Sequence, residues 1–210
     1  MIKLRVTEIL QIFGLFLALF AICIAITINF HPLYYFMVTK ENLGEKAGVS
    51  NAHLIKSYKD LLNFLNFPWI TELHMKLPTS YAAMQHYRDV KALFFKDYVV
   101  ATMGIPYSYW YLKKLRIQKC MWILIQPIYY LIIMIVLILF AMLINFNNFF
   151  IVFHKILFRN NDWLFDPNLD PIINALPESY FMACFILFLS LFFACLIGLL
   201  MCGKNELKKK

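Results

Sequence analysis

Charged residues are scarce in this sequence. Only 15% of its 210 residues are Asp, Glu, Lys or Arg, whereas 62% are hydrophobic. Soluble domains carry about a quarter charged residues, so this composition excludes both an ordinary soluble domain and a disordered chain. The hydrophobic residues gather in blocks long enough to cross a bilayer, and what remains is too short for a large soluble domain. We therefore predict a single membrane domain over residues 1–210.

Several familiar catalytic and binding motifs are also missing. The sequence has no His-Glu-x-x-His, Glu-Glu-x-x-x-Arg or Gly-x-Ser-x-Gly motif and no glycine-rich phosphate loop. No cysteine cluster predicts zinc, and we expect neither a metal nor a cofactor. The hydrophobic blocks lack the chain of buried ionisable residues that transporters use. No basic patch is interleaved with aromatic residues, so we expect no nucleic acid as a partner.

The hydrophobic blocks predict four transmembrane helices. They cover about 9–28, 93–112, 121–143 and 180–202. A signal peptide is the alternative for the first block, but its apolar core would be shorter and no small-x-small cleavage site follows, so we expect a retained helix. The second block is weaker, because Lys96 and Asp97 lie near its start and Pro106 is expected to kink it.

Basic residues predict the orientation. With the amino terminus inside, segments 1–8, 113–119 and 203–210 face the cytoplasm and hold ten basic and two acidic residues. The other charges cancel, so the whole net charge of +8 lies on one side, as the positive-inside rule expects. We therefore predict a multi-pass protein with both termini cytoplasmic. All five cysteines fall in spans or at the inner face, so the outer side has no disulfide framework and no thiol nucleophile.

The two outer segments, about 29–92 and 144–179, predict a small mixed α/β extracytoplasmic cap. The β-prone run 34–38 predicts a short strand. Hydrophobic residues alternate with polar ones over 72–77, which also indicates a strand.

Helices are expected in the same cap. Ser50 is a suitable cap for a helix over about 51–66 that has one apolar face. A phenylalanine-rich stripe predicts an amphipathic helix over about 146–158, lying in the outer interface. From Tyr81 a helix could run without a break into the second span.

Two histidines in these outer segments are candidates for chemistry. His86 and Asp89 would share one helix face, where a carboxylate raises the basicity of an imidazole, although a plain surface pair is commoner. His154 lies on an apolar stripe between Phe150 and Phe158, and alone it is better explained as a core histidine bonded to a carbonyl. Considered as a pair, the two histidines favour a catalytic role over these simpler explanations. Both come to the same interface, where one can take a proton while the other gives one.

Other acidic residues have simpler explanations. Asp166 and Asp170 precede prolines, so turn formation is favoured over orienting His154 or a substrate amine. A metal site built from His86, His154 and an aspartate stays open, but no ligand spacing supports it.

The run from His86 to Lys91 resembles the His-x-x-Asp-Val-Lys motif of the lipoprotein intramolecular transacylases, bacterial membrane proteins of about this size. Further matches span about 58–180, whereas the first span, the loop at 31–50 and the tail match only in hydropathy and placement. The matching segments are Tyr58-x-x-Leu61-Leu62-x-x-Leu65, Leu77-Pro78-x-Ser80, Phe153–Phe158, Trp163, Asp166-Pro167, Asp170–Ile173 and Leu176–Glu178.

The resemblance implies an enzyme of the bacterial plasma membrane with its active site at the outer face. Such enzymes move the sn-2 acyl chain of a diacylglyceryl-cysteine lipoprotein to the α-amine of the same cysteine, giving a lyso-form product. The substrate's own amine is the nucleophile, so no covalent intermediate is needed.

The same resemblance suggests roles for individual residues. The family's catalytic histidines stand where His86 and His154 are found here. Asp89 and Lys91 match motif positions, for which we expect orientation of His86 and contact with the substrate backbone. We expect supporting or substrate-binding roles for Tyr58, Trp163 and Asp170.

Two other functions remain open at this point. An outer-leaflet lipid or lipoprotein ester hydrolase would use the same histidines with water as the nucleophile. A non-catalytic membrane scaffold would leave lipoprotein acylation unchanged. As partners of this protein we expect the diacylglyceryl-modified lipoprotein and membrane lipids, and we expect the protein to be a monomer.

Overall fold

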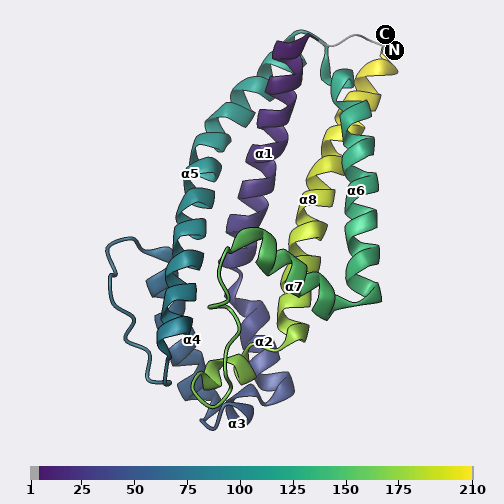
Figure 1. Cartoon of the computed structure of the whole chain (residues 1–210). Coiled ribbons are helices and arrows are strands. Elements are labelled where there is room, and N and C mark those ends of the chain that lie inside the picture. The colour runs from purple at the N-terminus through teal and green to yellow at the C-terminus, as the bar shows by residue number, and fades with distance from the viewer. Residues whose placement is uncertain (1–4, 210) are drawn as a thin grey trace. The chain divides into compact units, whose positions relative to one another are not determined.

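The computed structural model describes residues 5–209, which contain helices and no strand. Figure 1 shows the elements in chain order. They are α1 (Val6–Ile28), α2 (His31–Glu41), α3 (Leu43–Lys46), α4 (Asn51–Asn66), α5 (Tyr81–Ile117), the 3-10 helix η1 (Met121–Leu124), α6 (Ile125–Ile144), α7 (Phe146–Leu157), the 3-10 helix η2 (Pro171–Ala175) and α8 (Glu178–Leu207).

The chain forms two compact units. The first unit comprises Met1–Ile28, Asp97–Ala141 and Ile186–Lys210, and the second comprises Asn29–Lys96 and Met142–Phe185. Helices α5 and α8 each contribute a long part to each unit, and the last residues of α6 belong to the second unit.

Long hydrophobic helices make up the first unit. Three helical segments are long and apolar enough to cross a membrane: α1, η1 with α6, and α8. The predicted second span lies inside α5, which is not one of these three. Pro106 is inside this uninterrupted helix of 37 residues.

Small residues bring α1 and α5 close together in the first unit. A Cβ atom added to Gly104 would lie only 2.6 Å from the Cβ of Ala18. The hydroxyl of Tyr107 also donates a hydrogen bond to the carbonyl oxygen of Gln11 (2.8 Å). Close backbone approach at small residues is how helices pack where lipid removes most of the hydrophobic driving force.

The second unit has its own hydrophobic core. Helix α4 begins at the Ser50 cap, whose side chain accepts a hydrogen bond from the His53 amide, so the helix predicted over 51–66 is confirmed. Its apolar face buries Leu54, Leu61 and Leu65. Helix α7 covers most of the stretch predicted over 146–158, and Asn145 caps it by accepting from the Asn148 amide.

The prediction of a mixed α/β cap was wrong, because this region has no strand among the described residues. The run 34–38 lies in α2, which has a proline in its first turn and buries Tyr34, Met37 and Val38. Over 72–77 the predicted alternation of burial is present, since Leu77 is buried while the polar residues before it are exposed. A strand also needs a hydrogen-bonding partner, and α2 supplies none, because its backbone groups bond within the helix.

Candidate active site

The amino-terminal end of α5 is held by a buried carboxylate. Asp170 is 1% exposed, and it accepts hydrogen bonds from the backbone amide (2.6 Å) and the hydroxyl (2.8 Å) of Ser80. The Ser80 hydroxyl oxygen in turn accepts from the Ala83 amide (3.1 Å), as a helix cap does. A negative charge is favourable at a helix amino terminus. His86 follows this anchored end by less than two turns.

Helix α7 positions the second histidine. His154 is 8% exposed, and its Nδ1 lies 2.8 Å from the carbonyl oxygen of Phe150. A carbonyl oxygen can only accept, so Nδ1 carries the hydrogen and Nε2 of the neutral ring keeps a lone pair. The rings of Phe150 (4.0 Å) and Trp163 (4.9 Å) pack against it.

The structure brings the two predicted histidines together. The ring centroids of His86 and His154 are 5.9 Å apart. Phe158 touches both rings, at 4.7 Å from His86 and 5.7 Å from His154. Phe165 packs edge-on against His86 at 5.6 Å. Two imidazoles from different helices therefore share one aromatic environment.

Both imidazoles are held neutral by their surroundings. Burial, together with a smaller effect of the nearby His154, lowers the pKa of His86 to about 4, and Asp89 opposes this by a still smaller amount. Burial also lowers the pKa of His154, against a raising effect of the Phe150 carbonyl. Nδ1 of His86 is buried and has no hydrogen-bond partner among the described residues. At neutral pH both rings can accept a proton.

Two of the other predicted site residues, Asp89 and Lys91, tie loops to helix α5, and a third, Trp163, bonds within its own loop. The Asp89 carboxylate accepts a hydrogen bond from the side-chain amide of Asn160 (2.8 Å), which fixes the loop that follows α7. Lys91 donates to the carbonyl oxygens of Phe67 (3.0 Å) and Ile70, so it holds the loop after α4. Trp163 donates to the Asn160 carbonyl oxygen (3.1 Å).

Tyr58 packs among tyrosines in the core of the second unit. It stacks on Tyr34 with the ring centroids 3.7 Å apart, and its hydroxyl is 2.9 Å from that of Tyr180. It belongs to the buried core of the second unit.

Sequence reasoning missed Asn160 as a partner of Asp89, because one asparagine after a helix carries no signal of its own. It also missed the packing of Phe165 on His86 and the bond between Ser80 and Asp170. In the part of the chain that the structure describes, no three His, Cys, Asp or Glu side chains cluster closely enough to hold a metal ion.

The hydrophobic helices and the paired histidines define an integral membrane protein with an imidazole site. The family model described as lipoprotein intramolecular transacylase Lit matches residues 9–181, so the chain belongs to this family of acyltransferases. No curated protein matches the chain.

Solved structures agree with this assignment. The chain is similar to the membrane-integral lipoprotein intramolecular transacylase Lit from Bacillus cereus, with 26% identity and a TM-score of 0.88 over 96% of this chain and 94% of that one. Two structures of that protein with one histidine replaced each match with 26% identity and a TM-score of 0.78. The arginine and alanine variants cover 96% of this chain and 90% and 92% of their own.

Proposed function

We propose that this protein moves the sn-2 acyl chain of a diacylglyceryl-modified lipoprotein to the α-amine of the same cysteine. The product is N-acylated and keeps a monoacylglyceryl group, which makes it a lyso-form lipoprotein. The observation that carries the proposal is the 5.9 Å approach of His86 and His154, which come from different helices. Family membership supplies the substrate class.

The reaction needs one proton acceptor and one proton donor. The neutral amine attacks the ester carbonyl, a base takes the proton from the nitrogen, the bond to the sn-2 oxygen breaks, and that oxygen receives a proton. We assign His86 as the main base and His154 as its partner. Because Phe150 fixes the hydrogen on Nδ1 of His154, its Nε2 carries no proton at rest. The proton that His86 takes from the amine would therefore pass to this Nε2, which then gives it to the departing sn-2 oxygen.

The substrate supplies both reacting groups, so the protein needs no nucleophile and no cofactor of its own. Holding an amine and an ester together replaces a bimolecular encounter and can contribute several kcal/mol. A free α-amine has a pKa near roughly 8, and an apolar site favours its neutral form. The rings of Phe150, Phe158, Phe165 and Trp163 surround the imidazoles and would keep out the water that hydrolyses esters.

The proposal includes a topology. Residues 93–112 of α5 would form a fourth span beside the three long hydrophobic helices. Both termini would be cytoplasmic, because the net charge of +8 lies on their side. The two histidines would then act at the outer leaflet. The enzyme would work as a monomer.

Supporting roles follow from the contacts described above. Asp89 would act on His86 through its charge and through the Asn160 loop, and Asp170 would position α5. Lys91 would position the loop after α4 and leave its remaining donor for the substrate. Trp163 would orient His154, and Tyr58 would stabilise the core behind the site.

Replacing either histidine tests the proposal. We expect His86→Ala or His154→Ala to abolish the lyso-form product while the protein still inserts. His74→Ala is a matched control, because this histidine has an exposed side chain and lies outside the site. Mass spectrometry of the lipoprotein's amino-terminal peptide is the measurement.

The same spectra separate the alternatives. Transfer keeps the number of acyl chains and adds an amide, whereas a hydrolase would remove a fatty acid. A scaffold would change nothing. Full activity in His86→Ala or His154→Ala would remove that histidine from the mechanism.

A further inference from the structure

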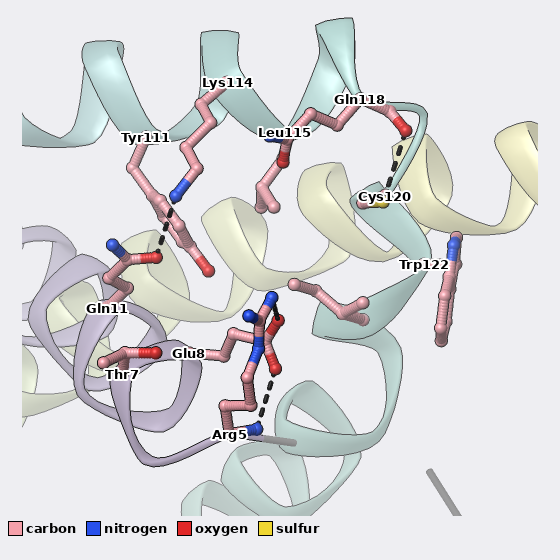
Figure 2. Close-up of a pocket in the computed structure, with 11 residues that line it drawn as sticks. Arg5, Thr7, Glu8, Gln11, Tyr111, Lys114, Leu115, Gln118, Cys120 and Trp122 are labelled. Carbon is pink, nitrogen blue, oxygen red and sulfur yellow. Dashed lines mark hydrogen bonds and ion pairs between the residues drawn. The ribbon is translucent and has the colours of Figure 1, made fainter. Parts of the chain in front are cut away.

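The first unit contains a pocket of about 480 Å³ that lies outside the histidine site (Figure 2). The beginning of α1, the end of α5 and the start of η1 line it. Its size falls in the range of small-molecule sites, about 300–1,000 Å³. Its lining combines cationic, amide and hydroxyl side chains, so the question is what it can hold.

The basic side chains of the pocket carry more positive charge than its carboxylate neutralises. The one carboxylate in its lining, Glu8, already accepts from the backbone amide (2.8 Å) and the guanidinium (3.2 Å) of Arg5. Lys114 donates to a neutral group, the side-chain oxygen of Gln11 (3.2 Å). Over residues 5–209, no carboxylate forms an ion pair with Lys114. An anion in the pocket would therefore meet an ammonium group that has no carboxylate within ion-pair distance in the described chain, although its charge already acts on Glu8 from farther away.

Tyr111 adds a second, independent observation. Its side chain is 1% exposed, and its hydroxyl has no hydrogen-bond partner among the described residues. Figure 2 shows the hydroxyl pointing into the pocket, on the side where Arg5 and Glu8 lie. A buried donor without a partner is costly, so an acceptor oxygen at this place would relieve it.

A second pocket of about 320 Å³ adjoins the first and shares Trp122 and Ile123 with it. The rest of its lining is mainly apolar and includes Ile125, Pro127 and Leu207. A polar pocket with a mainly apolar pocket beside it suits an amphiphile with an anionic head and a hydrocarbon chain. Basic pockets between transmembrane helices bind anionic lipid head groups in this way.

We propose that the pocket of Arg5, Tyr111 and Lys114 binds the phosphate of an anionic phospholipid, with its acyl part along Ile125 and Pro127. This site belongs to the end of the first unit where the basic residues gather, and it takes no part in acyl transfer.

The test uses the full chain, purified in detergent. Native mass spectrometry measures the binding of phosphatidylglycerol, phosphatidylcholine and inorganic phosphate. We expect one phosphatidylglycerol per chain, held in preference to phosphatidylcholine. Lys114→Gln should weaken this binding about fivefold, the factor expected for one basic residue near an anionic surface. Tyr111→Phe, which removes only the hydroxyl, should weaken it as well.

Lys113→Gln is the matched control, because it removes the same charge from the same end of α5 outside the pocket. Its binding of phosphatidylglycerol should stay near that of the unchanged protein. The proposal fails if Lys113→Gln weakens binding as much as Lys114→Gln, because diffuse attraction would then explain it. It also fails if the two lipids bind equally, or if inorganic phosphate at the same concentration displaces the lipid.

Discussion

At the scale of single residues, the hydrogen bond from His154 to the Phe150 carbonyl sets the chemistry of the site. It fixes one ring nitrogen as the donor and leaves the other as the acceptor. His86 has the opposite situation, since its Nδ1 is buried without a partner in the described chain. The two imidazoles are therefore not equivalent, although both are neutral at rest.

The partly buried ring of His86 predicts that the stability of the protein depends on pH. Its pKa is about 4 in the folded chain and about 6.5 when unfolded. Between these values the unfolded chain binds a proton that the folded chain does not, so the protein loses stability as the pH falls from 6.5 to 4. The loss is at most about 3 kcal/mol, because one pKa unit corresponds to about 1.4 kcal/mol.

Thermal unfolding in detergent at pH 7 and pH 5 measures this effect. His86→Asn should reduce the difference between the two midpoints, and His74→Asn should leave it unchanged. An unaltered difference in His86→Asn would contradict the assignment of the effect to this ring.

At the scale of elements, the buried carboxylate of Asp170 anchors the start of α5. Asp170→Ala leaves the amide and hydroxyl of Ser80 without their acceptor, so we expect a loss of about 1–3 kcal/mol in the free energy of unfolding. The product yield should fall too, because His86 follows this end of the helix. The unfolding midpoint and the lyso-form yield are the measurements.

Asp166→Ala provides the comparison. Among the described residues this exposed carboxylate accepts from Asn168 alone, within its own turn, so its loss should cost clearly less. Equal effects of the two substitutions on the unfolding midpoint would mean that the contact between Asp170 and Ser80 does not stabilise the start of α5.

How far the sequence predicts these elements depends on how local their causes are. The helices α4 and α7 follow from a cap and a 3.6-residue period, which lie within each segment. A strand needs a second strand to pair with. The alternation over 72–77 carries no information about residues 34–38, which fold as a helix and so cannot pair with it. The histidine pair was predicted from the placement of both residues at one interface and then from a family motif. Ser80 and Asp170 are 90 positions apart, and only the fold joins them.

At the scale of the whole molecule, the first unit depends on small residues where its helices meet. A Cβ atom on Gly104 would lie 2.6 Å from the Cβ of Ala18, which is too close for two carbon atoms that are not bonded to each other. Gly198 on α8 has nothing within 4 Å of the same position, so it has room for a methyl group. The two glycines therefore offer matched substitutions that differ only in their neighbours.

Gly104→Ala should push α1 away from α5, and overpacking of this kind costs about 1–3 kcal/mol. Gly198→Ala should be neutral or stabilising, because alanine is the better helix former by about 1 kcal/mol. The unfolding midpoints of both variants in detergent provide the measurement. Equal midpoints would mean that α1 and α5 separate freely, and that close backbone contact does not hold the first unit together.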